Sequence, residues 1–82
     1  MIGVNMMNDI KKIRDAILDE GFRCAVKSGD NNDAFIDVVW KRTDDNALEI
    51  VVDIIRDVCR GIQIRYVSGG VGKARLRVWC GV

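Results

Sequence analysis

The chain has 82 residues, of which 49% are hydrophobic and 30% charged, and its formal net charge is +1 at pH 7. This length suits a single domain, residues 1–82, with one hydrophobic core. Histidine is absent, which removes the usual general base near neutral pH and the commonest transition-metal ligand. No apolar run is long enough to span a membrane, and residues 1–7 lack the pattern of a secretory signal.

The first predicted helix begins at Asn8 or Asp9, since either side chain can cap the free N–H groups of a first turn. Its buried side is marked by three isoleucines at helical spacing, Ile10, Ile13 and Ile17. Gly21 ends the helix, because a residue without a Cβ atom adopts the left-handed conformation at low cost. The pattern therefore predicts an amphipathic helix that packs one side on the rest of the domain.

A hairpin is predicted after this helix. Apolar and polar residues alternate over 22–27 and 35–41, and the polar segment 28–33 joins the two runs. Such alternation on both sides of a segment rich in Gly, Asn and Asp is typical of an antiparallel hairpin. The segment 30–33 resembles part of a calcium loop, but the glycine and the glutamate that such a loop requires are missing.

The second predicted helix begins near Asn46, and Glu49 follows three residues later as in a capping box. Gly61 ends this helix, as Gly21 ends the first. Its buried stripe consists of apolar residues at helical spacing, Leu48, Val51, Ile54, Ile55 and Val58. The sequence thus predicts a second amphipathic helix of similar length.

The second predicted hairpin has strands over 62–67 and 74–80, joined by the glycine-rich segment 68–73. This segment is not a phosphate-binding P-loop, because Val67 and Ala74 stand where that motif needs glycine and Ser or Thr. Its glycines instead favour a tight turn. A looser role stays open, in which backbone amides and Lys73 meet a phosphate or a carboxylate of a partner.

The two helix–hairpin units resemble each other. Residues 21–40 and 61–80 share five of twenty positions at an offset of 40, namely Gly21/Gly61, Ser28/Ser68, Gly29/Gly69, Ala34/Ala74 and Val38/Val78. We therefore predict two repeats, about 8–41 and 46–80, related by a pseudo-twofold axis. Their α-β-β-α-β-β order predicts an α+β two-layer sandwich, in which a four-stranded, mainly antiparallel sheet carries both helices on one face.

Such a fold leaves the other face of the sheet uncovered. Alternate strand residues, Trp40 and Tyr66 among them, are expected to face the helices. The remaining strand residues are expected to point away: Arg23, Ala25, Lys27, Phe35, Asp37, Val39, Lys41, Gln63, Arg65, Val67, Arg75, Arg77 and Trp79. The candidate partner-binding residues come from this side and the adjoining turn: Phe35, Val39, Arg65, Lys73, Arg75, Arg77 and Trp79.

Charge is distributed unevenly along the chain. Residues 1–54 hold seven Lys or Arg and eleven Asp or Glu, whereas residues 55–82 hold six Lys or Arg and one Asp. Arginines beside an exposed tryptophan are typical of protein interfaces, so we expect a small protein–protein interaction module, either an inhibitor or adaptor or a homodimer. The alternative is a module that binds single-stranded DNA or RNA through the same face. A third interpretation gives Trp79 only a stabilising role, with its ring stacked on an arginine.

An enzyme is not expected, because the serines and cysteines have no histidine base and a domain of this size has little room for a water-excluding pocket. No cofactor, metal or small-molecule substrate is expected either. The three cysteines, Cys24, Cys59 and Cys80, are odd in number and have no CxxC spacing. They favour buried thiols over a disulfide framework, and hence a reducing, cytoplasmic location.

Overall fold

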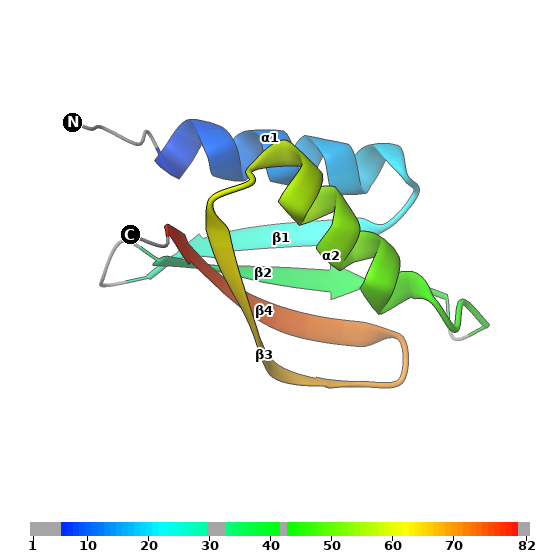
Figure 1. Cartoon of the computed structure of the whole chain (residues 1–82). Helices are drawn as coiled ribbons and strands as arrows, with labels where there is room; N and C mark the ends of the chain where they lie inside the picture. The colour runs from blue at the N-terminus through cyan, green and yellow to red at the C-terminus, as the bar shows by residue number, and fades with distance from the viewer. Residues whose placement is uncertain (1–5, 30–32, 42, 81–82) are drawn as a thin grey trace.

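The computed structural model describes residues 6–29, 33–41 and 43–80. Two helices and four strands follow one another in the predicted α-β-β-α-β-β order, which confirms the α+β class (Figure 1). The elements are α1 (Met6–Asp19), β1 (Arg23–Ser28), β2 (Asp33–Val39), α2 (Ala47–Val58), β3 (Ile62–Gly70) and β4 (Lys73–Cys80). Residues 1–5, and residues 30–32 of the first predicted loop, lie outside the described part of the chain.

The four strands form one antiparallel sheet in the order β1-β2-β4-β3. The central pair, β2 with β4, therefore joins the two helix–hairpin units. In this pair Ile36 lies directly opposite Leu76, and these two residues are equivalent in the predicted repeat. This register is the one that a twofold relation would give, while the repeat and the two-layer description themselves stay predictions.

Helix α1 begins earlier than expected from the sequence. Its first residue is Met6, so the prediction that Asn8 or Asp9 caps the helix is wrong, and both residues lie within its first turns. The predicted C-terminal end is confirmed: Gly21 has a φ of 91°, and its N–H donates to the carbonyl oxygen of Leu18 at 3.0 Å. The left-handed glycine thus satisfies one of the last free carbonyl groups of the helix.

Helix α2 has the predicted start but not the predicted cap. Asn46 is the N-cap residue, yet it makes no side-chain capping hydrogen bond, so the capping-box prediction is wrong. The helix ends at Val58 because Cys59 adopts an extended conformation, with φ −140° and ψ 98°, two residues before Gly61. Val51 and Ile55 are fully buried, whereas Ile54 and Val58 are only partly buried, so the buried face is rotated relative to the predicted stripe.

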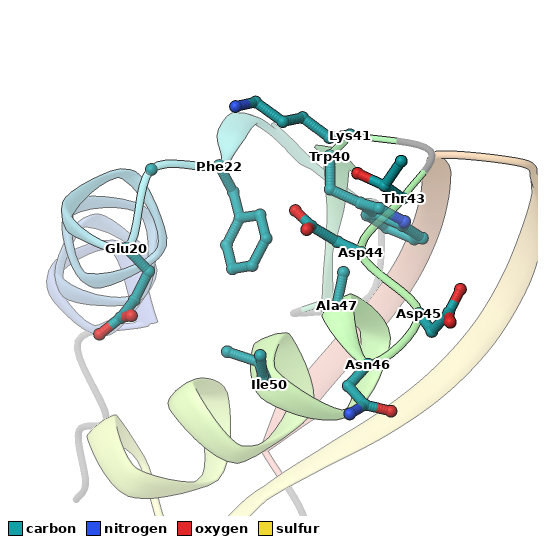
Figure 2. Close-up of a pocket in the computed structure, with 11 residues that line it drawn as sticks. Glu20, Phe22, Trp40, Lys41, Thr43, Asp44, Asp45, Asn46, Ala47 and Ile50 are labelled. Carbon is teal, nitrogen blue, oxygen red and sulfur yellow. The ribbon is translucent and has the colours of Figure 1, made fainter.

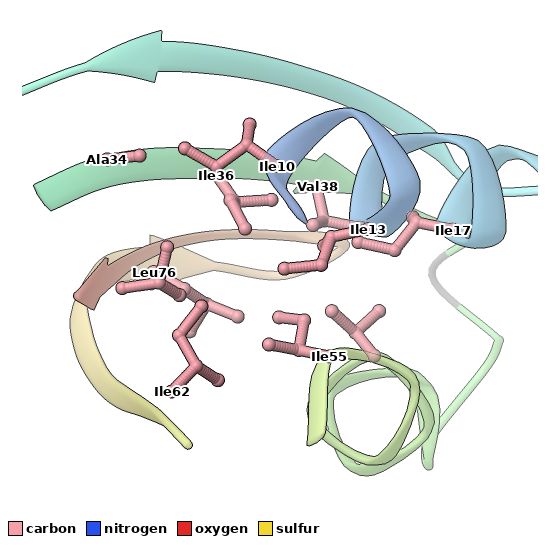
Figure 3. Close-up of a cluster of buried hydrophobic side chains, with 11 residues drawn as sticks. Ile10, Ile13, Ile17, Ala34, Ile36, Val38, Ile55, Ile62 and Leu76 are labelled. Atoms are coloured by element: carbon pink, nitrogen blue, oxygen red, sulfur yellow. The ribbon is translucent and has the colours of Figure 1, made fainter. Parts of the chain in front are cut away.

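The hydrophobic core lies between the helices and the sheet. Figure 1 shows both helices on the same side of the sheet, and Figure 3 shows their side chains pointing toward those of the strands. The predicted stripe of α1 is confirmed, with Ile13 and Ile17 fully buried and Ile10 nearly so. Fully buried partners come from the other elements: Ala34, Ile36, Val38, Val51, Ile55, Leu76 and Val78.

The second hairpin is longer and tighter than predicted. Ser68, Gly69 and Gly70 pair with β4, so only Val71 and Gly72 form the turn, and Gly72 has a φ of 78°. The prediction of a loop over 68–73 is therefore wrong. Pairs of small residues can continue a strand as well as end it, and cross-strand hydrogen bonds decide which occurs.

A β-bulge interrupts β3. The register shifts between Tyr66 and Ser68, which leaves Val67 without a direct partner on β4. Tyr66 lies directly opposite the core residue Leu76, so it is on the predicted, helix-facing side of the sheet, but it is 53% exposed because the helices do not cover it. β3 is an edge strand, and the Tyr66 hydroxyl lies against Gly69 instead of among helical side chains.

Candidate functional site

One face of the sheet is covered by the helices, and the other, here called the open face, is not. Its members are paired directly across the strands: Arg23, Ala25 and Lys27 of β1, Asp33, Phe35, Asp37 and Val39 of β2, Lys73, Arg75, Arg77 and Trp79 of β4, and Gln63, Arg65, Ser68 and Gly70 of β3. All seven candidate residues from the sequence lie on this face. Val39, Arg65 and Lys73 are exposed, and Phe35, Arg75, Arg77 and Trp79 are half-buried.

Asp37 and Arg75 form an ion pair near the middle of the open face. Arg75 donates from Nε to Oδ1 of Asp37 at 2.7 Å and from Nη2 to Oδ2 at 3.0 Å. This two-point contact is the preferred geometry between a guanidinium and a carboxylate. The hydrogen bond from Arg75 lowers the pKa of Asp37, and the carboxylate in turn raises the pKa of Arg75. Both groups therefore stay charged, and each neutralises the other.

A second ion pair lies one step along the same two strands. The Nε of Arg77 donates to Oδ2 of Asp33 at 2.6 Å, and the Asp33 side chain is only 7% exposed. The guanidinium carbon of Arg77 also lies 4.9 Å from the centroid of the Trp79 ring, which is a cation–π contact. Arg77 is thus held between a carboxylate and an aromatic ring.

Sequence reasoning missed Asp33 as a member of this site. The sequence placed it in a loop, whereas the structure makes it the first residue of β2, directly opposite Trp79. The available signal was the register: once Ile36 is paired with its equivalent Leu76, Asp37 falls opposite Arg75 and Asp33 opposite Trp79. Both carboxylates then lie within reach of an arginine on β4.

Charge on the open face is concentrated at its rim. Every charged side chain of the four strands lies on this face, and together they comprise six Lys or Arg and two Asp. The two aspartates are paired with Arg75 and Arg77 in the centre. Within the described residues, the other four cations make no ion pair: Arg23, Lys27, Arg65 and Lys73. The centre is therefore neutral, and the net positive charge lies around it.

A shallow pocket of about 360 Å³ lies at one end of the open face. Its walls include Asp37 and Val39 of β2, Lys73 and Arg75 of β4, and Ser68 of β3. Val38, Gly69 and Ala74 complete the lining. The pocket thus combines two cations, one hydroxyl and one apolar side chain beside a neutralised carboxylate.

A larger pocket, of about 680 Å³, lies away from the open face and was not predicted. It is formed where α1 ends, β2 ends and α2 begins, and in Figure 2 Phe22, Asp44 and Ile50 point into it. Trp40 and Lys41 also line it. Charges of both signs and apolar groups are mixed here, and the described lining residues form no ion pair such as those of the open face.

Cys24 is an unreactive thiol near neutral pH. Burial raises its pKa to about 11, an effect that nearby Arg14 partly opposes. The Sγ of Cys59 donates a weak hydrogen bond to Oδ2 of Asp9 at 3.8 Å. The side chain of Cys80 lies outside the described part of the structure. Cys24 therefore has the properties of a packing residue and not of a nucleophile.

In comparisons with known proteins, no protein-family model, no curated protein and no solved structure matches this chain. Among the described residues, no group of three or more His, Cys, Asp or Glu side chains is placed to hold a metal ion. Neither helix of the structure has the length and apolar character needed to cross a membrane.

Proposed function

We propose that this protein is a small non-enzymatic module that docks a protein partner on its open face, in the manner of an inhibitor or adaptor. The observation that supports it is the organisation of that face, which has a neutral zone along the two inner strands and a rim of cations. The neutral zone contains Phe35, two ion pairs and, toward one end, Trp79. Protein interfaces have this arrangement of an aromatic centre within a charged rim. Internally neutralised arginines can also be covered by a partner at a smaller desolvation cost than bare ones.

The same geometry disfavours the competing nucleic-acid hypothesis. Arg75 and Arg77, which would neutralise phosphates, are already paired with Asp37 and Asp33. One side of the Trp79 ring is covered by Arg77 and is not free to stack a base. Two carboxylates at the centre of the face would also repel a phosphate backbone. Only the cations at the rim of the open face still favour the nucleic-acid hypothesis.

We also propose that the protein works in a reducing, cytoplasmic compartment. Two observations support this proposal: Cys24 is a free cysteine, and the three cysteines of the chain are odd in number without CxxC spacing.

A capture experiment with matched variants tests the proposed function. The immobilised protein is incubated with lysate of its source cells, in parallel with Arg65→Glu and Arg56→Glu, which reverse one exposed arginine on the open face and one on α2. We expect a specific protein to be retained by the wild type and by Arg56→Glu and lost with Arg65→Glu. Equal retention by both variants, or capture that nuclease treatment abolishes, would contradict the proposal.

A further inference from the structure

The pocket on the open face has hydrogen-bond donors that no group of the described chain uses. A guanidinium has five N–H donors, and Arg75 engages its Nε and Nη2 on Asp37. Its Nη1 donates to no group of the described residues. Lys73, two residues earlier on the same strand and the same face, makes no ion pair within the described residues. Ser68 adds a hydroxyl directly opposite Arg75.

These donors surround a space that suits a carboxylate. Both oxygens of the Asp37 carboxylate accept from Arg75, and within the described residues no ion pair joins Asp37 to the Lys73 ammonium. Val39, which is 47% exposed and directly opposite Lys73, provides an apolar wall for a methylene stem. A side chain with a short apolar stem and a terminal carboxylate therefore matches both kinds of surface in the pocket.

Charge argues against a second copy of the chain as the occupant. Two open faces brought together would each bring four unpaired cations at the rim, Arg23, Lys27, Arg65 and Lys73. Like charges facing each other across an interface oppose association. A partner with an acidic surface has the opposite sign at the same positions and is attracted by the whole rim.

We propose that the open face recognises an acidic protein surface, and that an Asp or Glu side chain of this partner enters the pocket between Lys73 and Arg75. This inference rests on the proposed function and specifies the chemistry of the partner. Rim cations steer the partner toward the face, and the pocket fixes its position through charge-assisted hydrogen bonds.

An NMR titration of the whole chain tests this inference with three probes. They are a short peptide of alternating glutamate and leucine, the same peptide with glutamine at each glutamate, and an oligothymidylate. We expect the glutamate peptide to bind at least about tenfold more tightly than the other two and to lose affinity with added salt. The indole N–H signal of Trp79 on the open face should shift, whereas that of Trp40 beside the larger pocket should not.

Two lysine variants locate the contact. Lys73→Gln should weaken binding of the glutamate peptide by at least about fivefold. Lys27→Gln, a matched change on the edge strand β1 of the same face, should weaken it by less than about twofold. Equal losses of affinity in the two variants would show that the cations attract the peptide without a specific pocket, and this result would overturn the inference.

The probes separate this inference from the proposed function. Equal binding of the glutamate and glutamine peptides to the open face would refute the acidic partner but leave protein binding intact. Tighter binding of the oligothymidylate would refute both. Failure of all three probes to bind would refute the acidic recognition, and the capture experiment would still decide the proposed function.

Discussion

Arg77 donates to Asp33 across the central pair of strands, and the carboxylate that it neutralises is almost completely buried. Reversal of this arginine would place a second carboxylate beside the first. We therefore expect Arg77→Glu to lower the free energy of unfolding by about 2 kcal/mol or more, measured by urea denaturation. Arg65→Glu, on the neighbouring edge strand, should change it by less than about 0.5 kcal/mol. Equal stability of the two variants would show that the Asp33–Arg77 pair does not stabilise the fold. Because Arg65→Glu is expected to leave stability nearly unchanged, Arg65 is the better position for testing binding.

Two isoleucines of α2 should differ in how much they contribute to stability. Ile55 is fully buried and Ile50 is 42% exposed. Ile55→Ala should lower the free energy of unfolding by about 2–5 kcal/mol, because it removes buried methyl groups and leaves a cavity. Ile50→Ala should lower it by less than about 1 kcal/mol. Comparable losses in chemical denaturation would mean that α2 packs through a different side.

Gly69 is predicted to tolerate no side chain, although its φ is negative. A Cβ atom there would lie 2.7 Å from the carbonyl oxygen of Lys73 and 3.1 Å from the Cα of Ala74. Because both atoms belong to the backbone of β4, Gly69→Ala should cost about 1–3 kcal/mol of stability. Gly61→Ala is the matched control, since nothing lies within 4 Å of its Cβ position. A thermal melt that ranks Gly61→Ala as the more damaging change would contradict this account.

The Asp37–Arg75 pair predicts a pH dependence of a particular sign. The lowered pKa of Asp37 in the folded state means that the pair stabilises the protein above about pH 3.9, its unfolded value, and that this stabilisation is lost as the pH falls through the folded pKa. Arg75→Gln should move the pKa back toward the ordinary range, as followed by the NMR signal of the Asp37 carboxyl carbon. Lys27→Gln should have a smaller effect, because the hydrogen bond from Arg75 is the larger cause. An unchanged pKa in Arg75→Gln would be incompatible with the ion pair.

The Cys24 thiol should resist alkylation. With a pKa of about 11, almost none of it is thiolate at neutral pH, and the thiolate is the reactive form. Mass spectrometry of iodoacetamide-treated folded protein should find Cys24 unmodified at pH 7 and increasingly modified in the alkaline range. Rapid modification at pH 7 would show that this side chain is more accessible than the structure indicates.

The amino-acid sequence was sufficient to predict the number and order of the helices and strands, but not the contacts between them. Helix α1 was recognisable from Ile10, Ile13 and Ile17, because a buried helical face needs apolar residues at this spacing. Its end was recognisable from Gly21 alone, because glycine adopts the left-handed conformation at low cost. The order of the strands depends on which edges meet in three dimensions, and local patterns carry no such information. The length of β3 was missed for a similar reason, since Gly69 and Gly70 form strand only because β4 supplies their partners.

The sequence predicted which residues lie on the open face, but it did not predict the ion pairs between them. Alternation along the strands was enough to place Phe35, Arg65 and Trp79 on one side of the sheet. The ion pairs depend on cross-strand register, which joins residues about forty positions apart in the chain. The sequence therefore suggested a face of bare arginines, whereas the structure shows a neutral centre.

The bulge at Val67 has a consequence for the behaviour of the protein at high concentration. β3 is an outer strand, and a long regular outer strand offers a template on which identical molecules can add without limit. A bulge breaks the regular spacing of donors and acceptors along that template and increases the local twist. The irregularity therefore helps to keep separate molecules from polymerising into fibrils.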